Sequence, residues 1–252
     1  MEYRILGKTG LKISRMGFGG IPIQRIDAEG TKALMHKLLE NGVNYIDTAR
    51  GYTVSEEYLG IGLEGIREHF VLATKSMSRT AEAMAKDIDI SLKNLRTDYI
   101  ALYQIHNAPP ADVEKVCSPG GALEALTAAK KAGKIGHIGI TAHSLETFRM
   151  ALELPWVETI MFPYNIVEDQ AKELIHACAE KNIGFIAMKP LAGGAIEDAV
   201  TALRYVCANP DVTVVIPGMA DIAELNQNLA AVNDSSPLSV EEEAKMRAIR
   251  DA

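Results

Sequence analysis

The sequence predicts a (β/α)8 barrel, an α/β fold in which parallel strands alternate with helices. Short apolar runs rich in β-forming residues alternate with amphipathic helical stretches along almost the whole chain, which indicates parallel strands joined by crossovers. Eight such units fill most of the 252 residues, a length typical of this barrel. An open doubly wound sheet is the alternative, but Gly17–Gly20 at the end of the first strand does not continue into a phosphate loop that opens a helix.

The individual elements follow from the apolar runs and their periodicity. The expected strands lie within residues 14–20, 43–49, 70–75, 99–106, 134–141, 158–165, 183–190 and 212–218. The expected helices are Ala28–Glu40, Glu56–Glu64, Ala81–Leu95, Ala122–Ala132, Leu145–Leu152, Gln170–Glu180, Ile196–Ala208 and Ile222–Ala231. Gly or Asn follows several of these helices, and both residues readily adopt the left-handed conformation that terminates a helix. Ser55, Ser144 and Asp221 are candidate N-caps.

Two segments lie outside the repeating units. Tyr3–Leu6 and Leu11–Ser14 flank a Gly-Lys-Thr-Gly turn, which predicts a β-hairpin that closes the bottom of the barrel. After the last unit, Ser239 is a candidate N-cap of one short C-terminal helix. No repeat or low-complexity tract divides the chain, so we expect a single domain over residues 1–252.

The composition is ordinary for a globular protein, with 48% hydrophobic and 23% charged residues. A formal net charge of −7 argues against nucleic acid or an anionic membrane as a partner. The N-terminus has no apolar signal segment, and no apolar run reaches membrane length. Cys117, Cys178 and Cys207 fit neither a disulfide framework nor a metal site, so we expect buried thiols in a cytoplasmic protein without a metal.

Four polar residues mark the ends of three consecutive predicted strands: Asp47, Tyr52, Lys75 and His106. Each strand is apolar and then changes abruptly to a group that can hold or move a proton. Because the C-terminal ends of parallel strands open on one side of the sheet, we expect these side chains to converge in one cleft.

Together the four side chains form a proton-transfer site centred on a phenol. The pKa of a phenol lies near 10, and a neighbouring ammonium such as Lys75 lowers it by stabilising the anion. A carboxylate anchors the lysine and balances its charge, and an imidazole can hydrogen-bond the oxygen that receives the proton. These groups suit the protonation of a carbonyl oxygen while hydride arrives at the carbon.

Short motifs along the chain resemble those of the aldo-keto reductases, in the order and at the spacing of that family. They are Asp47-Thr-Ala-x-x-Tyr52, Ser55-Glu56-Glu57-x-Leu59-Gly60, Thr74-Lys75, Gln104-Ile-His106, Gly133-Lys134-Ile135-x-x-Ile138-Gly139, Tyr164-Asn165, Pro190-Leu191-Ala192-Gly193-Gly194, Val215-Ile216-Pro217-Gly218 and Glu224-x-x-x-Asn228. The resemblance covers essentially the full length. It implies a (β/α)8 barrel that reduces a small aldehyde or ketone, with Tyr52 as general acid.

The resemblance also implies a nicotinamide cofactor, NADP(H) by family default, bound extended across the mouth of the barrel. The positions that it marks as cofactor contacts are Gly20, Asp47, Thr141, His143, Met188, Lys189, Pro190, Leu191, Gly193, Pro217, Gly218, Met219, Glu224 and Asn228. We take a monomer as the default state.

Several of these positions depart from the family pattern. Thr141-Ala-His143 stands where a Ser-Asn pair is usual, Met161 replaces a glutamine, and Met188 replaces the aromatic residue that stacks on the nicotinamide. A thioether can still cover an aromatic face. Gly218 and Glu224 stand where Lys and Arg often hold a 2′-phosphate. Glu224 repels that phosphate and suits a free ribose hydroxyl, so NAD(H) is a serious alternative.

The motifs most resemble the branch whose longer members carry a cysteine-rich iron–sulfur extension, which is absent from this sequence. We expect an open substrate pocket formed by the loops at Ile21–Arg25, Arg50–Val54 and Met77–Arg79. The longer loop Asn107–Gly120 is either a lid or plain surface variation.

A reductase is not the only function that suits these residues. A nicotinamide-binding regulatory or redox-sensing barrel with weak catalysis is the alternative, and the altered nicotinamide contacts favour it slightly. The complete set of four polar residues argues against it.

Overall fold

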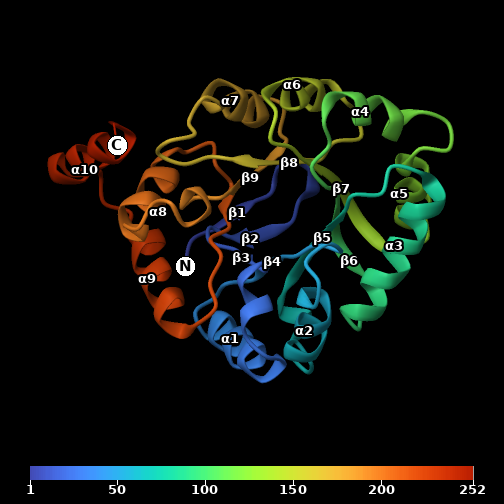
Figure 1. Ribbon diagram of the computed structural model, residues 1–252, viewed down its shortest axis with the longest axis horizontal. Helices are drawn as coiled ribbons and strands as arrows, with labels where there is room; N and C mark the ends of the chain where they lie inside the picture. The colour runs from blue at the N-terminus through green and yellow to red at the C-terminus, as the bar shows by residue number, and fades with distance from the viewer. Residues whose placement is uncertain (252) are drawn as a thin grey trace.

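Residues 1–251, which the computed structural model describes, contain eight parallel strands curled into a barrel inside a ring of helices (Figure 1). The strands pair with their neighbours in chain order from β3 to β10. Main-chain bonds from Gly17 to Val215 and from Gly19 to Pro217 join the first strand to the last and close the barrel. The predicted fold is confirmed.

The strands of the barrel are β3 (Phe18–Gly19), β4 (Tyr45–Asp47), β5 (Val71–Ser76), β6 (Ile100–Ile105), β7 (Ile135–Thr141), β8 (Thr159–Pro163), β9 (Gly184–Met188) and β10 (Val214–Val215). The surrounding helices are α1 (Ala28–Glu40), α2 (Ser55–Gly62), α3 (Ala81–Asn94), α4 (Pro110–Cys117), α5 (Ala122–Lys131), α6 (Leu145–Glu153), α7 (Lys172–Glu180), α8 (Ala199–Ala208) and α9 (Ile222–Asn233). Helix α10 (Val240–Asp251) lies outside the ring beside α8 (Figure 1).

The N-terminal hairpin is also confirmed. Strands β1 (Tyr3–Ile5) and β2 (Lys12–Ser14) pair antiparallel. Lys8 N–H donates to Asn182 O just before β9, so the hairpin lies at the N-terminal ends of the barrel strands. Leu6 and Ile13 pack with Tyr45, Leu102 and other interior side chains and fill the bottom of the barrel.

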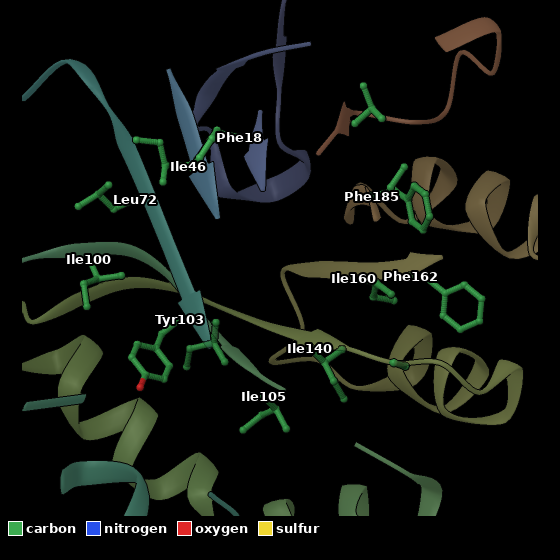
Figure 2. Packing of buried hydrophobic residues seen from close by; sticks show 14 of the residues in the cluster. Phe18, Ile46, Leu72, Ile100, Tyr103, Ile105, Ile140, Ile160, Phe162 and Phe185 are labelled. Carbon is green, nitrogen blue, oxygen red and sulfur yellow. The ribbon is translucent and has the colours of Figure 1, made fainter. Parts of the chain in front are cut away.

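A second apolar layer lies between the strands and the helices. Figure 2 shows Phe18, Ile46, Leu72, Ile140 and Phe185 among its side chains, which come from strands all around the barrel. Alternate residues of each strand therefore face either the interior or the helices. The helices bury their apolar faces on the outer layer and hold the strand ends in place.

Local signals decided where most helices begin. Asp221 Oδ1 accepts from Glu224 N–H, and Ser144 Oγ accepts from Glu146 N–H, so both predicted N-caps are confirmed. Ser239 and Glu242 cap each other across the first turn of α10. The prediction for Ser55 is wrong, because α2 has Val54 as its N-cap and the Ser55 hydroxyl donates to Gly20 O instead.

Two further expectations need correction. The segment Asn107–Gly120 is not a plain loop, because it contains α4, which begins favourably with Pro110 in its first turn. The cysteines are not all buried, since Cys178 is buried but Cys117 on α4 is exposed.

No helix in residues 1–251 has the length and apolar character needed to cross a membrane.

The close packing of α2 on the end of α3 depends on Gly60. A Cβ atom at this position would lie 2.0 Å from Asn94 O, so Gly60→Ala forces the two helices apart. We expect the free energy of unfolding to fall by about 1–3 kcal/mol, measured by urea denaturation. Gly51→Ala is the control, because a Cβ atom there meets nothing within 4 Å. Equal stability of Gly60→Ala and the wild type would contradict this packing.

Candidate active site

The four predicted site residues lie on one side of the barrel, at the C-terminal ends of neighbouring strands. Asp47 is the last residue of β4, Lys75 lies near the end of β5, and His106 directly follows β6. Tyr52 lies on the connection between β4 and α2. The structure therefore brings together four side chains that span about a quarter of the chain, as expected from parallel strands.

A buried ion pair forms the base of this cluster. Asp47 and Lys75 are each 2% exposed, and Lys75 Nζ donates to Asp47 Oδ1 and, at 2.8 Å, to Thr48 O. Gln104 Nε2 donates to the other carboxylate oxygen at 3.2 Å. Burial alone lowers the pKa of Lys75, but the Asp47 carboxylate and then Tyr52 outweigh it and raise that pKa above its ordinary value. Lys75 is therefore held as a cation.

The ring of Tyr52 lies next to this cation and to the imidazole. Lys75 Nζ is 4.9 Å from the Tyr52 ring centroid, and the His106 ring meets Tyr52 edge-on with 5.9 Å between centroids. Burial raises the pKa of Tyr52 above its ordinary value, although Lys75 lowers it. The Lys75 ammonium lowers the pKa of Tyr52 as expected, but burial raises that pKa by more. The phenol therefore remains protonated at neutral pH.

His106 is a neutral imidazole. Burial, followed by the charges of Lys75 and Arg79, lowers the pKa of His106 to about 3. Its Nδ1 atom is buried and has no hydrogen-bond partner within residues 1–251. Either neutral tautomer therefore leaves Nδ1 without a partner inside the described part of the protein.

The connection that carries Tyr52 is fixed at both ends. At its start, Thr48 Oγ1 lies 2.8 Å from Ser55 Oγ, which donates to Gly20 O at 2.9 Å. At its end is Glu56, 1% exposed, whose carboxylate accepts hydrogen bonds from Thr74, Ser91, Arg50 and Asn94. The sequence motif contains Glu56, but its function as an anchor was missed because its donors come from α3, β5 and the connection itself.

The predicted nicotinamide contacts lie at the same end of the barrel. Thr141 ends β7 and is buried, with its Oγ1 accepting from Asn107 N–H at 2.8 Å. His143 is exposed, and its Nδ1 lies 2.9 Å from Asn107 Oδ1. Met188 is half-buried at the end of β9. The structure thus leaves His143, and in part Met188, accessible to a ligand.

The segment after β9 makes a tight irregular turn. Lys189, Ala192, Gly193 and Gly194 all have positive φ angles, between 49° and 102°. Pro190 is buried and Leu191 is half-buried, whereas the Lys189 side chain and both glycines are exposed. A Cβ atom on either glycine would meet nothing within 4 Å, so the surface here is open.

The last group of predicted contacts surrounds β10 and α9. Gly218 is exposed, and Pro217 O accepts from Gly19 N–H beside the predicted contact Gly20. Met219 is fully buried, so neither its side chain nor its backbone is exposed to a ligand in this structure. Asn228 is 4% exposed, and its amide makes no hydrogen bond within the described residues.

Helix α9 begins with two carboxylates. Asp221 Oδ1 accepts from Glu224 N–H at 2.8 Å, and Glu224 Oε2 accepts from Ala220 N–H at 2.7 Å. No lysine or arginine occurs in α9. The N–H groups at the start of α9 are thus partly occupied by the chain's own acidic groups.

Comparison with known proteins identifies the family of this chain. The model of the Aldo/keto reductase family matches residues 15–201. L-galactose dehydrogenase from Arabidopsis thaliana is 27% identical, with 96% of this chain and 92% of the relative covered. An aldo-keto reductase from Schizosaccharomyces pombe named for NADP(+) is 26% identical, with 74% and 61% covered.

Solved structures of aldo-keto reductases also resemble this chain. An aldo-keto reductase from Bacillus halodurans, solved in its holo form, superposes with a TM-score of 0.85 and 25% identity, covering 99% of this chain and 96% of that one. The family match spans most of the chain and includes Asp47, Tyr52, Lys75 and His106. The chain therefore belongs to the aldo/keto reductase family of oxidoreductases.

Proposed function

We propose that the protein is a nicotinamide-dependent reductase that converts an aldehyde or ketone to an alcohol, with Tyr52 as the general acid. The observation that carries this proposal is the Asp47–Lys75 ion pair beside the Tyr52 ring, with the neutral His106 at its edge. A protonated phenol, a fixed cation and a neutral donor are what proton delivery to a carbonyl oxygen requires.

Each side chain has a distinct part in the proposed reaction. Tyr52 is protonated at neutral pH and gives its proton to the carbonyl oxygen, and the Lys75 cation stabilises the phenolate that remains. Asp47 keeps Lys75 in place and balances its charge. His106 donates from Nε2 to the carbonyl oxygen and so orients the substrate.

The residues at the mouth fit a nicotinamide nucleotide. The free amide of Asn228 and the open turn at Gly193 and Gly194 are available to hold it, together with Thr141, His143 and Met188. When bound, such a nucleotide supplies hydride to the carbonyl carbon.

The charge at the start of α9 supports NAD(H) over NADP(H). The resemblance places the adenosine end of the cofactor near Glu224 and Asn228. Glu224 and Asp221 together bring two negative charges to this helix N-terminus, which disfavours a 2′-phosphate and suits free ribose hydroxyls. In contrast, the relative from Schizosaccharomyces pombe that is named for NADP(+) supports NADP(H).

Replacing Tyr52 with phenylalanine tests the general acid. Tyr52→Phe keeps the ring and removes the proton, so turnover of a small aldehyde falls by about two to four orders of magnitude. Nucleotide affinity stays the same, as measured by titration of the purified variant. Tyr58→Phe on the neighbouring helix α2 is the matched control and keeps full activity. If Tyr52→Phe turned over as fast as the wild type, Tyr52 would not be the general acid. If the wild type bound the nucleotide tightly but showed no turnover, the redox-sensing alternative would be favoured.

A paired titration with NADH and NADPH tests the cofactor. We expect NADH to bind about five- to tenfold more tightly, because Glu224 opposes the extra phosphate. Glu224→Gln still accepts the hydrogen bond from Ala220 N–H but removes the negative charge, so it reduces the difference between the NADH and NADPH affinities. Glu224→Lys reverses the preference between the two nucleotides. The single Trp156 lies at the opposite end of the barrel, before β8, so the fluorescence of the reduced nucleotide is followed. Tighter NADPH binding to the wild type would show that another basic group dominates.

The protonation of His106 is measurable by NMR of ring nitrogens. We expect the His106 ring to stay neutral from about pH 8 to about pH 5, whereas the pKa of the exposed His176 is raised because its ring is hydrogen-bonded to the Asp211 carboxylate. The unfolded chain binds a proton at His106 below pH 6.5 and the folded one only near pH 3. Folding stability is therefore lost as pH falls through this window, and His106→Gln reduces that loss. Protonation of His106 near pH 6.5 would contradict its role as a neutral donor.

A further inference from the structure

Arg79 connects three parts of the active-site wall. It follows β5, is 9% exposed, and its Nη2 atom donates to His106 O at 2.8 Å and to Asn107 O at 3.0 Å. Its Nε atom donates to Asp112 Oδ2 at 2.8 Å in the first turn of α4. One guanidinium thus joins the β5 connection, the backbone at His106 and helix α4.

The backbone held by Arg79 is in an unfavourable conformation. Asn107 has a φ of 47°, in the left-handed region that costs free energy for a residue with a side chain. From the other side, Asn107 N–H donates to Thr141 Oγ1, and Asn107 Oδ1 contacts the His143 ring. This turn directly after His106 persists because groups on both sides bind it.

The imidazole itself has little else to fix its direction. Nδ1 makes no hydrogen bond within residues 1–251, and the ring meets Tyr52 only by an edge-on contact. The direction of Nε2 therefore depends on where the backbone places the Cα–Cβ bond of His106, and Arg79 binds that backbone. The Arg79 cation also disfavours protonation of the ring.

We propose that Arg79, fixed by Asp112, is a positioning residue that sets the direction of the His106 imidazole. The proposal rests on the proposed function of His106 as the donor to the carbonyl oxygen. It assigns a purpose to α4, which supplies the carboxylate that fixes Arg79. The segment Asn107–Gly120 then acts as a support of the site wall, in place of the lid or the plain surface variation that the sequence left open.

The test uses Arg79→Lys, which retains the charge but removes the planar pair of donors to two carbonyl groups. We expect kcat for carbonyl reduction to fall between about tenfold and a hundredfold through misplacement of His106, with nucleotide affinity unchanged. Asp112→Asn gives a smaller loss in the same direction. Arg204→Lys is the matched control, because Arg204 also binds backbone carbonyl groups and a carboxylate, Glu242, but at α10. It leaves kcat unchanged.

A double-mutant cycle separates positioning from a general structural effect. In the His106→Gln background, Arg79→Lys has little further effect, because the ring that it positions is gone. An equal loss in both backgrounds would overturn the proposal. Thermal unfolding confirms that each variant is folded.

A spectroscopic readout keeps the proposal independent of turnover. In protein labelled with 15N-histidine, the six histidines give ring signals, and His106→Gln identifies that of His106. Arg79→Lys should shift or broaden the His106 signal, and Arg204→Lys should not. An unchanged His106 signal in Arg79→Lys would overturn the proposal. Absence of carbonyl turnover in the wild type would instead count against the proposed function, and the NMR comparison would still decide on Arg79.

Discussion

The buried ion pair between Asp47 and Lys75 is the constraint around which the active-site end of the barrel is arranged. Two charges with almost no exposure are tolerated only because each is paired and hydrogen-bonded, here also by Gln104 and the Thr48 carbonyl group. Removing one partner of such a pair typically costs about 3–5 kcal/mol. The apolar interior below, which includes Tyr45 and Leu102, excludes water and strengthens the pair.

The buried surroundings of this ion pair also set the protonation state of the neighbouring Tyr52 and His106. The same low-dielectric surroundings raise the pKa of Tyr52 and lower the pKa of His106, so both groups are neutral at physiological pH. In the proposed reaction, the neutral phenol beside the fixed cation releases its proton as the substrate oxygen becomes basic. Burial disfavours the charged forms of Tyr52 and His106. The site therefore has two neutral hydrogen-bond donors next to one cation, Lys75.

The connections after the strands do the remaining positioning. Glu56 anchors the segment with Tyr52, and Arg79 binds the backbone at His106, each through donors or acceptors from other elements. The turn after β9 and the acidic start of α9 shape the opposite part of the mouth. The strands fix where the side chains of the candidate site begin, and we propose that buried polar contacts of these connections fix where they point.

The sequence by itself determined the barrel, the hairpin and the convergence of Asp47, Tyr52, Lys75 and His106. The alternation of strands and helices can be recognised from the local periodicity of apolar residues, and the C-terminal ends of parallel strands necessarily lie on one side of the barrel. Only the tertiary structure decided that α4 replaces a plain loop, that Ser55 binds Gly20 in place of capping α2, and that burial outweighs Lys75 at Tyr52. It also revealed Arg79 and Glu56 as anchors. These outcomes depend on contacts between residues distant in sequence and on desolvation, neither of which has a local pattern.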